Sequence, residues 1–409
     1  MVVSNLDFYK SLVRYKSKFF LVFIFSFGIM APLFSQVKDS VAQTDILEFL
    51  FKKKAAKIAA KNKKKKVNIS LFPAFGTTPA TGLAGVVAAN FAFCTGKEET
   101  THLSSISASA AYTSKQQFVL PIRSYIWLKN NSWSLPSDFR FMKYPQSTYG
   151  LGAKSDKENE VLVDYLYLRI YQQALKSIGS NFYAGGGVFC DQFWQIEQED
   201  WNKPYASEFE DYNYGTNSRA YAGGVGVNFT YDDRANPINP GKASYASVLY
   251  RVNPGFLGNE QSWESVYADF RKYIFVPGKM QKNILGFWLL YWGVTGGTSP
   301  YLLLPSNGWD NHTSSGRGYE QGRFRGKHMI SIETEYRYRI SRNGLLGGVV
   351  FTNATTFPEK SGRIETVNPA IGAGLRIKLN KTSNTNLIID FALGLNNNKG
   401  FYLDVGEIF

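Results

Sequence analysis

The stretch that decides the fold is ISIETEYRYRI, residues 330–340. In an extended chain, successive side chains point to opposite faces, so this stretch has one apolar and one polar face. The apolar face carries Ile330, Ile332, Tyr336, Tyr338 and Ile340. The polar face carries Ser331, Glu333, Glu335, Arg337 and Arg339. A soluble sandwich would not bury four charges on one side of a strand, whereas a barrel with a polar lumen and a lipid-facing wall does.

Other segments repeat this alternation. Ile371–Leu379 sets Ile371, Ala373, Leu375, Ile377 and Leu379 against Gly372, Gly374, Arg376 and Lys378. Leu387–Leu395 and Tyr221–Tyr231 follow the same rule. About sixteen candidate strands start near Val67, Ala80, Leu103, Gln117, Asn131, Val161, Gly179, Arg219, Ala243, Ser262, Lys282, Lys327, Gly344, Glu365, Thr385 and Gly400.

The connections between these strands alternate in length. The long ones, at 145–160, 193–218 and 296–326, all fall on the side away from the two chain ends. Long external loops and short periplasmic turns are typical of outer-membrane barrels. The sequence therefore predicts an all-β chain in which residues 67–409 form a transmembrane antiparallel β-barrel.

The N-terminus has the order of a secretory signal. A basic region is followed by the apolar run Phe19–Phe34 and the small residue Ser35. This order predicts a signal peptide over residues 1–35, cleaved after Ser35, with an uncleaved membrane anchor as the alternative. An exported barrel belongs in the outer membrane of a Gram-negative bacterium, with outer-membrane lipid around it.

The net charge of +14 is concentrated in one segment. Nine lysines lie between Lys52 and Lys66, and without this segment and the signal the chain is close to neutral. A local run of charge does not predict a nucleic-acid partner. Residues 36–66 are expected to form a basic periplasmic segment. It is either a solvated tail or an attachment to anionic lipid headgroups or an acidic partner.

The residues for catalysis are scarce. The three histidines, His102, His312 and His328, lack metal-ligand spacing, and no Gly-x-Ser-x-Gly motif occurs. We expect neither an enzyme nor a cofactor. Cys94 and Cys190 are too few for a disulfide framework. Each fits a small apolar strand residue, and a single bridge between them stays open.

Three stretches together carry a family resemblance. They are TYDDRANPINPG at 230–241, GRGYEQGRFRG at 316–326 followed by EYR at 335–337, and the terminal FYLDVGEIF. The chain resembles the BamA/TamA (bacterial surface antigen) superfamily of outer-membrane assembly and translocation barrels. In that family a long external loop folds into the lumen and carries an Arg-Gly-aromatic motif at its tip. The matching residues here are Arg317, Gly318 and Tyr319, with Gly316 at the usually larger first position.

The resemblance also implies partners for this loop. The family's arginine contacts a glutamate on the next strand, matched by Glu335, and an aspartate on the strand after it, where this chain has Asn353. The family's periplasmic turn matches Asp232, Arg234 and Gly241, for which we favour a structural role. By alternation, Phe401, Leu403, Val405 and Phe409 share the outer face of the barrel-closing strand, with the terminal aromatic at the membrane interface.

The resemblance implies a barrel that helps to insert, translocate or hold another molecule. Its mechanism would be a weak seam between the first and last strands, 67–75 and 400–409, whose edges pair with a client strand. The family's periplasmic receptor domains find no room in residues 36–66. A passive channel or transporter is the competing interpretation, and an outer-membrane hydrolase is a third. The sequence names no client.

Overall fold

The computed structural model describes residues 42–50, 67–78, 81–198, 209, 211–276, 283–358, 363–364 and 366–409. The expected signal peptide and the lysine-rich Lys52–Lys66 lie outside these ranges, so both stay predictions.

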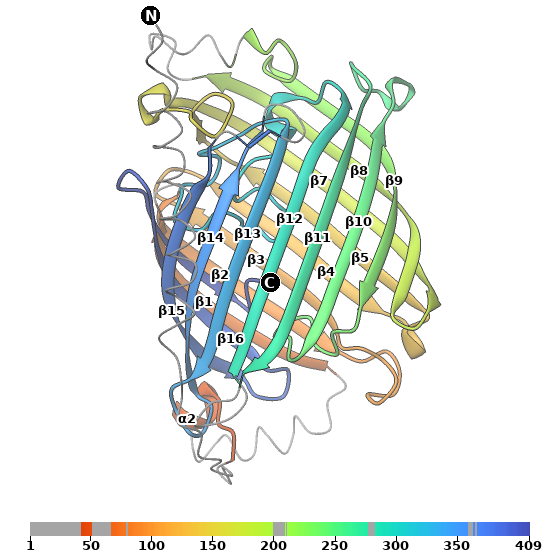
Figure 1. Cartoon of the computed structure of the whole chain (residues 1–409), viewed down its shortest axis with the longest axis vertical. Coiled ribbons are helices and arrows are strands. Elements are labelled where there is room, and N and C mark those ends of the chain that lie inside the picture. The colour runs from red at the N-terminus through yellow and green to blue at the C-terminus, as the bar shows by residue number, and fades with distance from the viewer. Residues whose placement is uncertain are drawn as a thin grey trace, which may run out of the picture.

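The described strands form one antiparallel sheet that curls into a barrel (Figure 1). Apart from the short β6, each strand pairs with its neighbour in the chain. The strands are β1 Val67–Thr78, β2 Gly82–Phe93, β3 Ser104–Thr113, β4 Phe118–Trp127, β5 Trp133–Lys143, β6 Gln146–Thr148, β7 Val161–Gly179, β8 Phe182–Gln198, β9 Arg219–Asp232, β10 Ala243–Asn253, β11 Trp263–Val276, β12 Asn283–Gly297, β13 His328–Arg339, β14 Leu346–Thr356, β15 Asn368–Asn380, β16 Thr385–Gly394 and β17 Lys399–Val405. The helical segments are α2 Ile46–Leu50 and the 3₁₀ turns η1 Lys129–Asn131, η2 Lys157–Asn159, η3 Gly255–Leu257 and η4 Tyr301–Leu303.

The seventeen strands correspond to the sixteen expected ones with one of them interrupted. Strands β5 and β6 both pair with β7, one after the other along the same edge. Between them, the Tyr144 amide donates to the Tyr165 carbonyl at 2.9 Å. Pro145, which follows, has no N–H to continue the ladder. The predicted all-β barrel is confirmed, and the strand starts agree within a few residues.

Burial follows the predicted alternation. On β13, Glu333 and Glu335 are buried, whereas Ile332 is 53% exposed on the outer face. The exceptions are Leu379 of β15 and Leu387 of β16, which are both buried although they were assigned to the outer face. The pairing of β15 with β16 shifts register between Lys378 and Asn380, so the alternation ends there.

The sheet is not closed along its whole circumference. Strand β17 has seven residues and lies beside β1, which has twelve, but no backbone ladder joins them within the described part of the chain. An unpaired seam therefore separates the first strand from the last. Each of these two strands pairs on one side only, β1 with β2 and β17 with β16.

The two ends of the barrel differ. At one end three long connections meet, because Gly152 bridges to Arg325 and the Tyr301 amide donates to the Tyr214 carbonyl at 2.9 Å. At the other end lie short turns and α2, at the bottom of Figure 1. There Glu48 of α2 pairs with Lys381 of the β15–β16 turn. None of the helices in the described ranges is long and apolar enough to cross a membrane.

The two cysteines are unbridged. Cys190 lies within β8 as expected, but Cys94 follows the last residue of β2 and belongs to the connection to β3.

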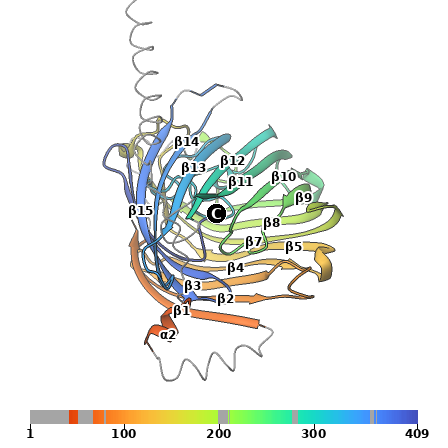
Figure 2. The same ribbon diagram turned by 60° about the horizontal axis from the view of Figure 1, so that its bottom comes forward.

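The last four residues correct one expectation. Strand β17 ends at Val405, Gly406 has φ +124°, and the tail turns into the lumen, where Figure 2 places the C-terminus inside the ring of strands. Phe409 is 2% exposed, with its ring 5.4 Å from that of Trp288. Its carboxyl oxygen accepts a 2.9 Å bond from Arg337. The prediction that Phe409 lies on the outer face with Phe401 is therefore wrong.

The physical reason is that Gly406, with its positive φ, ends the strand, so strand alternation no longer sets the face of the residues that follow it. Within the polar lumen, the Phe409 oxygen gains a charge-assisted hydrogen bond from Arg337. Glycine at 286 leaves space for the ring, since a Cβ there would lie 3.1 Å from the Phe409 side chain.

Substitution of Phe409 by alanine keeps the carboxylate but removes the buried ring. We expect the free energy of unfolding to fall by about 3–5 kcal/mol, as for other buried aromatic truncations. Urea unfolding in detergent micelles measures this change. Phe391→Ala, which truncates a ring 47% exposed on the outer face, serves as the control and should cost less. Equal losses for the two variants would contradict the buried position of Phe409.

Candidate functional site

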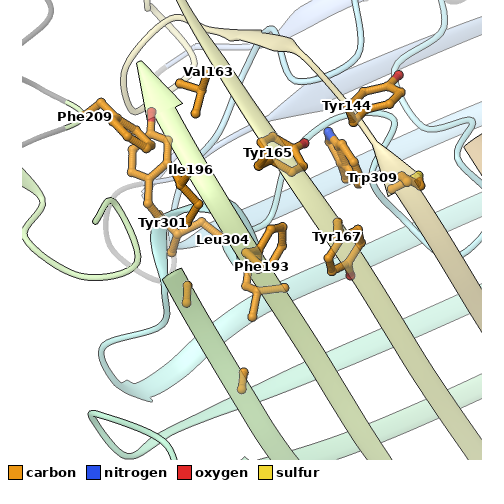
Figure 3. Close-up of a cluster of buried hydrophobic side chains, with 14 of the residues drawn as sticks. Tyr144, Val163, Tyr165, Tyr167, Phe193, Ile196, Phe209, Tyr301, Leu304 and Trp309 are labelled. Atoms are coloured by element: carbon orange, nitrogen blue, oxygen red, sulfur yellow. The ribbon is translucent and has the colours of Figure 1, made fainter. Parts of the chain in front are cut away.

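The connection from β12 to β13, the lumen loop (residues 298–327), folds back into the barrel. Its side chains Tyr301, Leu304 and Trp309 are buried against the strand residues Tyr165 and Tyr167 (Figure 3). The Trp309 indole donates to Gln146 at 3.0 Å, and the Tyr301 and Thr148 hydroxyls lie 2.7 Å apart. This aromatic packing fills the lumen at the end where the long connections meet.

The tip of the lumen loop is shaped by its own hydrogen bonds. The Asp310 carboxylate accepts from the backbone amides of His312, Ser314 and Ser315 at 2.8, 3.1 and 2.8 Å. The Asn307 side chain accepts from the Phe324 amide at 2.8 Å, across the loop. These side-chain bonds add to the backbone bonds across the loop, such as that from the Asn307 amide to the Phe324 carbonyl at 3.2 Å.

Arg317 is only 1% exposed, as are Asp310 and Arg325 of the same loop. Its Nη1 donates to the Asp390 carboxylate at 2.5 Å, and its Nη2 contacts both Glu333 and Glu335. The guanidinium also lies 3.5 Å from the centre of the Phe351 ring, a cation–π contact. One loop side chain therefore joins strands β13, β14 and β16.

Asn353 does not contact the guanidinium of Arg317. Its side-chain amide instead donates to the backbone carbonyl of Arg317 at 2.8 Å. The acid that the resemblance implies at this position is absent, and the structure brings a different acid, Asp390 of β16, to the arginine. The second acidic partner of Arg317 thus lies on β16, two strands further along the wall than the expected β14. Glu335 contacts Arg317 as expected.

The residues that flank Arg317 fix the loop to the wall. Gly318 has φ +105°, and a Cβ there would lie 2.7 Å from Ala370, so the backbone approach requires glycine. Its amide donates to the Tyr402 hydroxyl at 2.9 Å. The Tyr319 hydroxyl donates to the Pro369 carbonyl at 2.7 Å and accepts from the Leu395 amide at 3.0 Å.

The arginine belongs to a larger network of buried charges. Arg337 bonds Glu335 at 2.8 Å, and Arg376 bonds Asp390 at 2.5 Å and Glu407 at 2.8 Å. Three arginines thus face four side-chain carboxylates (Glu333, Glu335, Asp390 and Glu407) and the chain terminus. Burial alone would lower the pKa of the Arg317 guanidinium, but the neighbouring carboxylates raise it above its ordinary value.

The periplasmic turn places two of its three expected residues together. Arg234 forms a bidentate pair with Asp232 at 2.8 and 2.9 Å, and both side chains are buried. The guanidinium lies 4.0 Å from the centre of the Tyr245 ring. Gly241 lies apart, with only Phe275 near the position of a Cβ, so no close approach requires glycine there.

The same turn also extends across the barrel mouth. The Asn236 and Asn239 side chains donate to the carbonyls of Ser383 and Asn384 in the β15–β16 turn, at 2.9 and 3.0 Å. On the other side, the Leu103 amide donates to the Ala235 carbonyl at 3.3 Å. Residues 233–242 therefore cross the lumen at the end of the barrel that carries the short turns.

On the closing strand, Phe401, Leu403 and Val405 pair with Phe391, Ile389 and Leu387 of β16. Their intervening neighbours Tyr402 and Asp404 point into the lumen, where Tyr402 contacts the lumen loop.

No family model and no curated protein matches the chain. Among solved structures, CdiB from Acinetobacter baumannii is similar with a TM-score of 0.52 at 11% identity, over 83% of this chain and 60% of that one. BamA from Haemophilus ducreyi, in a crystal structure lacking POTRA domains 1–3, gives a TM-score of 0.49 at 14% identity. That match covers 84% of this chain and 69% of that one.

The chain therefore shares its barrel fold with CdiB. At this level of identity the likeness concerns the fold alone.

Sequence reasoning missed several of the contacts that surround the lumen loop. Asp390 and Glu333 were placed on the polar wall but not assigned to Arg317. Tyr402 was not connected to the loop, and Glu407 was not connected to Arg376. Alternation gives the face of each residue, but it does not tell which positions of distant strands stand at the same height. The sequence did hold one signal for Glu333: it lies two residues from Glu335, so both carboxylates point to the same face of the strand.

Substitution Arg317→Met should leave three buried carboxylates without their shared cation. Breaking a buried ion pair from one side costs about 3–5 kcal/mol. We expect the lumen loop to detach and become open to protease. Arg317→Lys should rescue only partly, because an ammonium is a point charge that cannot bridge carboxylates as a planar guanidinium does.

Limited proteolysis of the folded barrel, with mass spectrometry of the cut sites, measures this change. Lys327→Met removes an exposed cation at the end of the same loop and is the control. Cleavage within 298–327 that stays at the wild-type rate in Arg317→Met would disprove the anchoring role.

Proposed function

We propose that the chain is an assembly or translocation barrel of the outer membrane, which inserts, exports or holds another molecule through the seam between β1 and β17. The observation that carries this proposal is the missing ladder between these two strands. Backbone N–H and C=O groups that are unpaired within lipid each cost several kcal/mol. A strand from another molecule would satisfy them by adding to the sheet edge.

The lengths of the two strands support the same conclusion. Because β17 has seven residues and β1 has twelve, β17 cannot cover the whole edge of β1 even when the two approach. The side chains that flank this edge are apolar and exposed, among them Ile69, Leu71 and Phe75. The β1 edge is thus suited to an apolar partner strand at membrane depth. The fold shared with CdiB is compatible with this role.

A protein crosslinking experiment tests the seam. A photo-reactive residue at Ile69 or Leu71 should capture partner strands in native outer membranes, because these positions flank the unpaired edge. The same residue at Val227, which is 52% exposed on the paired strand β9, is the matched control. Locking the seam should then abolish the captured product.

The lock is a panel of cysteine pairs that combine Ile69, Leu71 or Pro73 of β1 with Phe401 or Leu403 of β17, after Cys94 and Cys190 are replaced by serine. The control lock joins Ile389 to Leu403, which are already directly opposite in the β16–β17 ladder. Capture that survives the seam lock, or that is equal at Val227, would refute the proposal.

The passive channel makes a different prediction. Since the lumen loop packs into the barrel through Tyr301, Trp309 and Arg317, we expect small or no steady conductance for the intact protein in planar bilayers. Replacing residues 306–325 by a short Gly-Ser linker should produce large, steady pores. Large conductance of the unaltered chain would favour the channel over the assembly role.

A further inference from the structure

A cavity of about 310 Å³ lies in the lumen beyond the tip of the lumen loop. Asn311 and His312 of that tip line one side, and residues 404–409 of the C-terminal tail line another. The space exists because the wall of β2 and β3 carries small side chains, including Ala88, Ser105 and Ser107. Its size is near the lower limit of about 300–1,000 Å³ for small-molecule sites, so it suits a compact ligand.

Most of the charges around this cavity are matched. Arg271 bonds Asp269 at 2.8 Å, and Arg234 has its bidentate pair with Asp232. Glu407 is held by Arg376 at 2.8 Å. These pairs are satisfied without any further molecule.

Arg123 of β4 is a cation without a carboxylate of its own. Its nearest carboxylate, Asp138, lies 3.7 Å from Nε and already accepts two bonds from Arg140 at 2.8 and 2.5 Å. Asp138 also pairs with Arg169 at 3.3 Å, so three arginines share one carboxylate. The Nε atom of Arg123 is buried without an acceptor among the described residues, and its Nη2 has only the Thr313 hydroxyl at 3.3 Å.

Asp404 of β17 is the corresponding anion on the other wall. Its carboxylate accepts only the amide of the next residue, Val405, at 2.7 Å, and it has no ion pair within the described ranges. Asp404 and Arg123 line the same cavity and interact electrostatically across it, but they do not meet in a direct ion pair. The cavity therefore separates a cation that shares its one carboxylate with other arginines from an exposed carboxylate that has no ion pair within the described ranges.

We propose that this cavity binds a small zwitterionic solute, whose anionic group pairs with Arg123 and whose ammonium pairs with Asp404. A simple anion would leave Asp404 unneutralised, and a simple amine would leave Arg123 unneutralised. Only a ligand with both charges satisfies both walls. Ser107, which is directly opposite Arg123 in the β3–β4 ladder, adds a hydroxyl beside the anionic group.

Two sources share this chemistry, a free amino-acid-like or phosphoethanolamine-like solute and the headgroup of a zwitterionic lipid. O-phosphoethanolamine is the probe for the first, and a short-chain dihexanoyl phosphatidylethanolamine is the probe for the second. Both are titrated calorimetrically into the full chain in maltoside micelles. Tighter binding of the lipid than of the free headgroup supports the site and assigns it to lipid, and the reverse supports the site and assigns it to a solute.

The specificity arms use inorganic phosphate and ethanolamine, which each carry one of the two charges. We expect one O-phosphoethanolamine to bind per chain, at least tenfold tighter than either single-charge probe. Arg123→Met and Asp404→Asn should each weaken its binding at least tenfold. Asp164→Asn is the matched control, since Asp164 pairs with Lys143 and is not part of the cavity wall.

A charge reversal guards against a variant that merely misfolds. Asp404→Lys should lose O-phosphoethanolamine but gain phosphate binding, because two cations then face the cavity. Phosphate that binds wild type as tightly as the zwitterion, with Asp404→Asn unchanged, would overturn the proposal. So would the absence of saturable binding by both O-phosphoethanolamine and the short-chain lipid, which would leave the cavity filled by water alone. None of these outcomes depends on the client strand at the seam.

Discussion

The constraint on which the rest of the structure depends is the pairing of backbone hydrogen bonds within lipid. Each strand must find neighbours on both edges, and a sheet achieves this only by curling until its first and last strands meet. Here the sheet curls but the last pairing is missing between β17 and β1. The proposed function follows from this one incomplete ladder.

The lumen face of the same sheet is under a different constraint. Once the lumen loop excludes water, the charged groups of the wall need partners within the protein. Arg317 meets this need for the acidic wall of β13 and β16 by placing one planar cation among three carboxylates. The C-terminal carboxylate and Glu407 extend this network through Arg337 and Arg376. The tail that leaves the sheet after Val405 is thus held by the same charges that hold the lumen loop. The unpaired last strand and the buried loop are parts of one electrostatic arrangement.

The barrel was predictable from sequence because strand periodicity is a local property. ISIETEYRYRI alone separates the charged face from the lipid face, and sixteen such segments define the number of strands. Contacts between distant strands were not predictable, because alternation does not show which residues of different strands lie at the same level along the barrel axis. Thus Glu335 was placed near Arg317 only through a family resemblance, and Asp390 was not assigned to it.

Two further residues show where local patterns fail. Phe409 was expected on the outer face because it lies an even number of residues after Phe401. Gly406 ends the strand, however, and alternation does not apply to the residues after it. Leu379 fails for a related reason, since the register shift beside it resets the alternation. Both errors arise at strand ends, where a single glycine or irregular pair outweighs the hydrophobic pattern.

The turn 233–242 spans one end of the barrel and connects opposite parts of its rim. It bonds to Leu103, next to β3, and to Ser383 and Asn384, next to β16, so it connects the rim on both sides of the seam. If the seam opened, these bonds would hold the two strands together at the rim with the short turns, and the gap would be widest at the opposite rim. These linkages are made by neutral amides and carbonyls, which neither salt nor physiological pH weakens. The bonds at this rim would accordingly persist under conditions that loosen the charged contacts of the lumen.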